Sequence, residues 1–232
     1  MLGVEETVAR LRGHLAALHA LVLATGARIP QTSRLDAKSA LADHLHDDAT
    51  AAVRVAERIE ELGDRVAERI EELGGGDATT AGPSTDADLI DALRAHVAAT
   101  DPLVDEPTLR VLTEVLAHQQ RHRLDPVPGG PEPGAALEPR DSQVQRLIAG
   151  RLAAADEAAR AIAASPQGAP SEHRRLARRC WDAMRHVAAL ERLEPYSGAT
   201  AAVAPADARL PGHENLLAHM LADDRRHERA SG

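Results

Sequence analysis

The segment HLHDDATAAVRVAERIEELG, residues 44–63, has the pattern of a long amphipathic helix and is the main evidence for the predicted fold. Apolar residues recur at helical spacing, and the stripe consists of Leu41, Leu45, Val53, Ile59 and Leu62. We predict that this helix starts near Asp36 and continues towards Leu73.

The second half of this helix contains a tandem duplication over residues 54–74. The sequence RVAERIEELGD of residues 54–64 is followed by RVAERIEELG in residues 65–74, with a period of 11 residues. Eleven residues are close to three α-helical turns, so the copy lengthens the helix and keeps its buried face in register. Gly63 weakens the junction, and an alternative is that the helix ends there.

The composition of the whole chain favours an all-α fold. Alanine accounts for 47 and leucine for 28 of the 232 residues, Phe is absent, and Trp181 and Tyr196 are the only aromatic residues. β-sheet proteins use more β-branched and aromatic side chains. We expect one helical domain over residues 1–232, with extra helices around a bundle core and long Pro/Gly/Ala-rich connections. The Pro/Gly-rich connection at 125–140 is predicted to be mobile, and a second connection spans 195–212.

Charge and residue usage exclude several classes of protein. The net charge of −9 and the two aromatic residues argue against nucleic acid as a partner. No apolar run approaches the roughly 20 residues that span a bilayer, and no secretory signal is evident, so we predict a cytoplasmic protein without a membrane partner. Cys180 is the single cysteine and is expected to pack in the core. Lys38 is the single lysine and lacks a phosphate-binding loop around it.

Four of the twelve histidines lie near acidic residues, or their replacements, on predicted core helices. His44 and Asp48 share one face of a helix, as do Asp224 and His227. His122 follows Gln119, and His186 follows Ala183, at the same spacing of three residues. By contrast, His14, His19, His96 and His173 are interpreted as surface or hydrogen-bonded core residues.

The stretches around these histidines resemble the core helices of bacterial ferritin-like domain proteins. The segments are HLHDDATAAVRVAERIEELG, DEPTLRVLTEVLAHQQRH, LARRCWDAMRHVAALERL and LLAHMLADDRRHE. The resemblance implies a four-helix carboxylate bundle whose polar side chains point inwards. It also implies that six candidate residues converge on the interior, namely His44, Asp48, His122, His186, Asp224 and His227.

The departures from the family pattern argue against a standard di-iron centre. Ala51 stands where a histidine would follow Asp48, and Gln119 and Ala183 stand where carboxylates would precede histidines. Such a centre typically uses about four carboxylates and two histidines. We therefore predict no metal and no cofactor.

Three functions are compatible with these residues. The first is a small-molecule biosynthetic enzyme, including one of specialised metabolism, in which Asp/His pairs catalyse a condensation or a Pictet–Spengler-type cyclisation by acid–base chemistry. The second is a metal-dependent oxidase or oxygenase with an altered site. The third is a non-catalytic helical interaction protein. We place the first ahead, with a small molecule as partner and homo-oligomerisation left open.

Overall fold

The computed structural model describes residues 2–73, 86–124 and 143–200, and within these ranges the chain is helical without strands. The elements are α1 (Val4–Arg28), the 3-10 helix η1 (Ile29–Gln31), α2 (Leu35–Leu73), α3 (Asp86–Ala99), α4 (Glu106–Leu124), α5 (Gln143–Ala163) and α6 (Pro170–Thr200). The all-α prediction is confirmed. In the part of the chain described, no helix is both long and apolar enough to cross a membrane.

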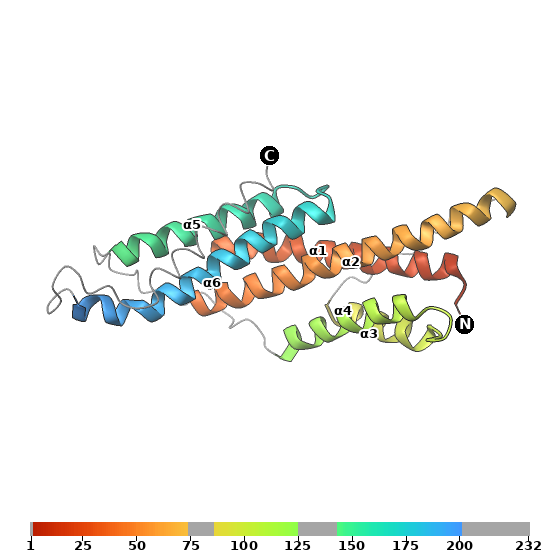
Figure 1. Cartoon of the computed structure of the whole chain (residues 1–232), viewed down its shortest axis with the longest axis horizontal. Coiled ribbons are helices and arrows are strands. Elements are labelled where there is room, and N and C mark those ends of the chain that lie inside the picture. The colour runs from red at the N-terminus through yellow and green to blue at the C-terminus, as the bar shows by residue number, and fades with distance from the viewer. Residues whose placement is uncertain (1, 74–85, 125–142, 201–232) are drawn as a thin grey trace.

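Helices α1, α2, α5 and α6 form a four-helix bundle (Figure 1). Helices α2 and α6 are antiparallel. Leu35, at the start of α2, packs near Leu190 of α6, and further along α2 Asp43 accepts a hydrogen bond from Trp181, which comes earlier in α6. The hairpins α1–α2 and α5–α6 are also antiparallel, so α2 and α5 run in the same direction. The chain therefore travels the length of the bundle between α2 and α5, and α3 and α4 belong to this crossover.

The bundle core is built mainly from aliphatic and alanine side chains. Its fully buried members include Val22, Ile29, Leu41, Leu45, Ala49, Ala159, Ile162 and Cys180. Small residues allow helices α1 and α5 to lie close together. At Gly26 of α1, a Cβ would lie only 3.1 Å from the Ala159 carbonyl oxygen of α5. A partly buried ion pair between Lys38 and Asp156 joins α2 to α5 at 2.6 Å.

Helices α3 and α4 pack outside the bundle, against α1 and α2 (Figure 1). This second apolar cluster contains Leu11, Leu18, Ala51, Val55, Leu89, Leu93, Leu112 and Val115. The family resemblance placed residues 105–122 among the core helices, and this placement is wrong, because α4 packs on α2 and α3 outside the four-helix bundle. The physical reason is that α2 has two successive apolar segments. Leu41, Leu45 and Ala49 of its first half enter the bundle, whereas Val55 and Leu62 of its second half pack with α3 and α4.

Two predicted helix boundaries are resolved by the structure. Helix α2 is continuous through Gly63 to Leu73, which confirms one long helix rather than an end at the duplication junction. A Cβ at Gly63 would meet nothing within 4 Å. Helix α6 continues to Thr200, past Pro195, where the sequence predicted an end. A proline keeps a helical φ, although it removes one backbone donor and crowds the carbonyl four residues before it, and nothing in the structure explains why the helix continues. The 125–140 connection and the 213–230 helix lie outside the described residues.

Candidate functional site

Three predicted site residues meet where α2 contacts α4, together with three side chains that extend the group. Positions separated by three or four residues share one helix face, which directs each set towards the other helix. The members are His44, Asp47 and Asp48 of α2 and His118, Gln119 and His122 of α4. We call these residues the α2–α4 polar cluster.

Asp48 is the most buried carboxylate of the cluster, with 3% of its surface exposed. The Gln119 amide donates a 2.6 Å hydrogen bond to Asp48 Oδ1, and Gln119 is itself buried. Buried carboxylates need such donors, since an unsatisfied charge in the interior is costly. Gln119, which appeared in the sequence as a lost metal ligand, therefore acts as a neutral partner of a carboxylate.

His122 lies between two carboxylates. Its Nε2 is 3.4 Å from Asp47 Oδ2, and its Nδ1 is 3.7 Å from Asp48 Oδ1. The His122 ring stacks on His44, with centroids 3.9 Å apart and an interplanar angle of 23°. An imidazole held in this way can take up a proton from one side while carboxylates stabilise the resulting cation.

The electrostatic environment assigns different charge states to two other members of the cluster. Burial acts to raise the pKa of Asp47, but the hydrogen bond from His122 and the nearby His118 and Arg121 outweigh it and lower that pKa. Burial lowers the pKa of His118, although the Asp47 carboxylate opposes the shift. Near neutral pH the cluster therefore contains an ionised Asp47 and a neutral His118.

A neighbouring group surrounds Trp181 where α6 meets α2. Trp181 Nε1 donates a 2.7 Å hydrogen bond to Asp43, and its ring stacks on His46 at 4.8 Å. The guanidinium groups of Arg178 and Arg185 lie 4.5 and 4.6 Å from the ring centroid. Trp181 thus packs between helices, with two cation–π contacts.

The remaining predicted site residues have different outcomes. His186 is buried on α6 with 8% of its surface exposed. It directly precedes Val187, which forms a small apolar cluster with Ile148 and Leu190. Asp224 and His227 lie outside the described residues. Among the residues that the structure describes, no three His, Cys, Asp or Glu side chains are arranged to hold a metal ion. Cys180 is buried, and burial raises the pKa of its thiol to about 12.

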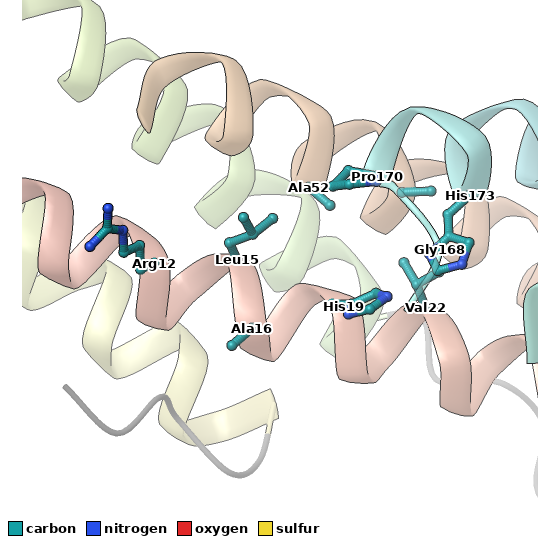
Figure 2. Close-up of a pocket in the computed structure, with 10 residues that line it drawn as sticks. Arg12, Leu15, Ala16, His19, Val22, Ala52, Gly168, Pro170 and His173 are labelled. Carbon is teal, nitrogen blue, oxygen red and sulfur yellow. The ribbon is translucent and has the colours of Figure 1, made fainter. Parts of the chain in front are cut away.

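A cavity of about 310 Å³ lies between α1, α2 and the start of α6. Figure 2 shows that His19 of α1 and His173 of α6 reach towards each other across it. Their rings stack at 5.0 Å. From the sequence, His19 and His173 are interpreted as surface or hydrogen-bonded core histidines, because nothing local shows that the two side chains meet in the folded chain.

His14 and His96 form a second pair that the sequence did not reveal. His14 Nε2 and His96 Nδ1 are 3.0 Å apart in a buried contact between α1 and α3. Both are hydrogen-bonded core residues, as the sequence interpretation allowed. Comparison with known proteins adds no family, since no family model, curated protein or solved structure matches this chain.

Proposed function

We propose that the chain is a small-molecule biosynthetic enzyme that uses metal-independent Asp/His acid–base chemistry. The observation that carries this proposal is the position of His122 between Asp47 and Asp48, at 3.4 and 3.7 Å. Acid–base catalysis requires a side chain that can take up and release a proton and neighbours that stabilise its charged form. A cytoplasmic location and any homo-oligomerisation stay predictions.

A ferritin-like bundle is part of the same proposal. Its support is the chain connectivity, since two antiparallel hairpins joined by one long crossover are the arrangement of ferritin-like folds. The proposal differs from the family pattern in using a polar cluster between α2 and the crossover helix α4. His186, Asp224 and His227 are proposed contributors from α6 and the segment that follows it.

The proposed reaction is a condensation of an amine with an aldehyde, followed by ring closure. The amine nitrogen attacks the carbonyl carbon, and loss of one water gives an iminium ion. A ring carbon then bonds to the iminium carbon, and the ring proton leaves to a base. His122 supplies and removes these protons, Asp47 and Asp48 stabilise its charged form, and Gln119 holds Asp48.

The proposal is tested with arylethylamines paired with aldehydes, by mass spectrometric detection of products that have lost one water. We expect the variant His122→Gln to slow product formation by about 10²- to 10⁴-fold, the usual contribution of one acid–base group. His46→Gln is the matched control, because His46 is a half-buried histidine of α2 that lies outside the polar cluster and stacks on Trp181. Helix content by circular dichroism should be equal in both variants.

Two results would contradict the proposal. Product formation at the uncatalysed rate with every pair would refute the condensation, and an unchanged rate in His122→Gln would refute the role of His122. Stoichiometric iron, manganese or zinc in the purified protein would favour the metal-dependent oxidase instead.

A further inference from the structure

The cavity between α1, α2 and the start of α6 lies outside the α2–α4 polar cluster, and its walls are mostly apolar. Its aliphatic lining consists of Leu15, Ala16, Val22, Ala49, Ala52 and Pro170. Ala49 and Ala52 are buried alanines of α2, and their small side chains leave the space that larger residues would fill. Gly168, two imidazoles and the exposed Arg12 complete the lining.

The tautomer of His173 is set by the loop before α6. His173 Nε2 lies 2.9 Å from the Ser165 carbonyl oxygen, which can only accept a hydrogen bond, so Nε2 carries the proton and donates. Nδ1 of the neutral ring is then an acceptor. This Nδ1 atom is buried and has no partner among the described residues.

Gly168 fixes the position of this ring. A Cβ at Gly168 would lie 2.5 Å from His173 Nε2 and 2.6 Å from Ser165 Oγ, so no larger residue fits without displacing one of them. Figure 2 shows Gly168 directly beside the His173 ring. The His173 residue is 1% exposed. Its acceptor atom Nδ1 is therefore held in one place before any ligand binds.

His19 provides the second polar group of the cavity. Its ring stacks on His173 with an interplanar angle of 28°, and its buried Nε2 also has no partner in the described part of the chain. Burial, together with the nearby His173, lowers the pKa of His19, so the ring is neutral at neutral pH. The cavity wall thus offers the uncharged His19 ring and the unpartnered His173 Nδ1 among aliphatic side chains.

We propose that this cavity binds an uncharged, largely apolar ring compound that carries a hydroxyl or N–H donor, and that this donor bonds to Nδ1 of His173. The unsatisfied acceptor requires a donor from the ligand, since buried polar atoms in folded proteins are nearly always paired. A carboxylate is disfavoured, because its oxygens would face the Nδ1 lone pair. Arg12 lies at the surface and is solvated, so it attracts an anion only weakly.

The size of the cavity fits such a ligand. A volume of about 310 Å³ is at the lower end of the range for small-molecule sites. A dry apolar cavity of about 150 Å³ holds one benzene ring. One substituted ring, or two small ones, therefore fills the space, and the stacked imidazoles offer a flat surface to it.

The test measures binding of three probes to the full-length protein by isothermal titration calorimetry at neutral pH. The probes are p-cresol, toluene and 4-methylbenzoate, which share one methylated ring and differ in the polar group. We expect p-cresol to bind at least about 5-fold more tightly than toluene, as one hydrogen bond contributes. We expect 4-methylbenzoate to bind more weakly than p-cresol.

Cavity-filling variants locate the site. Ala52→Leu fills the cavity from α2, and Ala16→Phe blocks it from an exposed position of α1 where folding is not at risk. Both should weaken p-cresol binding by at least about 10-fold, in line with loss of most of the apolar contact. Ala20→Phe is the matched control, because Ala20 is exposed on α1 and does not line the cavity.

Four outcomes would overturn the proposal. They are equal affinity for p-cresol and toluene, tighter binding of 4-methylbenzoate, no binding of any probe, and binding that survives both Ala52→Leu and Ala16→Phe. The measurement is independent of the proposed reaction, since His122→Gln should bind p-cresol as the unaltered protein does.

Discussion

The buried pair of His14 and His96 should make the protein unstable in mild acid. These side chains are 3% and 0% exposed and share one hydrogen bond of 3.0 Å between α1 and α3. Burial is the main cause that lowers the pKa of each to about 4, with Arg10 nearby adding to the effect in both. His96 also lowers the pKa of His14, whereas Asp105 and Glu6 act in the opposite direction on His96.

The sign of the effect follows from comparing the folded and unfolded states. The ordinary histidine pKa is 6.5, so the unfolded chain binds protons at these two residues below that pH. The folded pair binds them only near pH 4. Stability is therefore lost as the pH falls through this window. For one histidine, the shift corresponds to about 2 kcal/mol lost between pH 7 and pH 5. Since the two protonations are coupled, we expect about 2–4 kcal/mol for the pair.

The assay is urea unfolding followed by circular dichroism, with the free energy of unfolding measured between about pH 7 and pH 5. The variant carrying both His14→Leu and His96→Leu should lose much of the pH dependence. Replacing both partners by apolar groups leaves no orphaned nitrogen, so this variant should remain folded at neutral pH. If the double variant keeps the same pH dependence as the unaltered protein, the reasoning is refuted.

Three further predictions concern the bundle. Gly168→Ala should lower the melting temperature, because the new Cβ meets side-chain atoms at 2.5 and 2.6 Å, whereas Gly150→Ala, with nothing within 4 Å, should raise it slightly. Lys38→Met should destabilise by about 3–5 kcal/mol in urea unfolding, since it leaves the Asp156 carboxylate unpaired, and the double change Lys38→Met, Asp156→Leu should restore most of the loss. Cys180, with its thiol pKa of about 12, should resist alkylation at mildly alkaline pH until urea unfolds the chain; rapid alkylation of the folded protein would contradict its burial.

The helices could be predicted from the sequence because their signals are local. Apolar spacing around Leu45 and Leu62 and the eleven-residue duplication specify a helix without reference to any partner. The choice of neighbours is not local. Helix α4 has one apolar stripe, which fits a bundle core as well as the second half of α2. Its place is decided by the apolar residues that α2 carries beyond the bundle, such as Val55 and Leu62.

For the polar sites too, contacts within one helix could be predicted from the sequence and contacts between helices could not. His44 and Asp48 lie on one helix at a spacing of four, so their association could be predicted. The partner of Asp48 could not, because Gln119 is far away in the chain and was interpreted as a lost ligand. The stack of His19 on His173 also depends on how α1 and α6 are placed in the folded bundle, and no spacing along the chain encodes that contact.

The abundance of histidine in this chain has a structural reason that separates the candidate site from the other histidines. Aromatic residues make up 1% of the sequence, and imidazoles provide the flat rings at several helix contacts instead. The pairs are His14–His96, His19–His173 and His44–His122. Histidine number is therefore no measure of catalytic function here. Within the described residues, His44–His122 is the pair in which a ring nitrogen lies within 4 Å of a carboxylate oxygen. This contact, rather than the stacking, is what supports the proposed proton transfer.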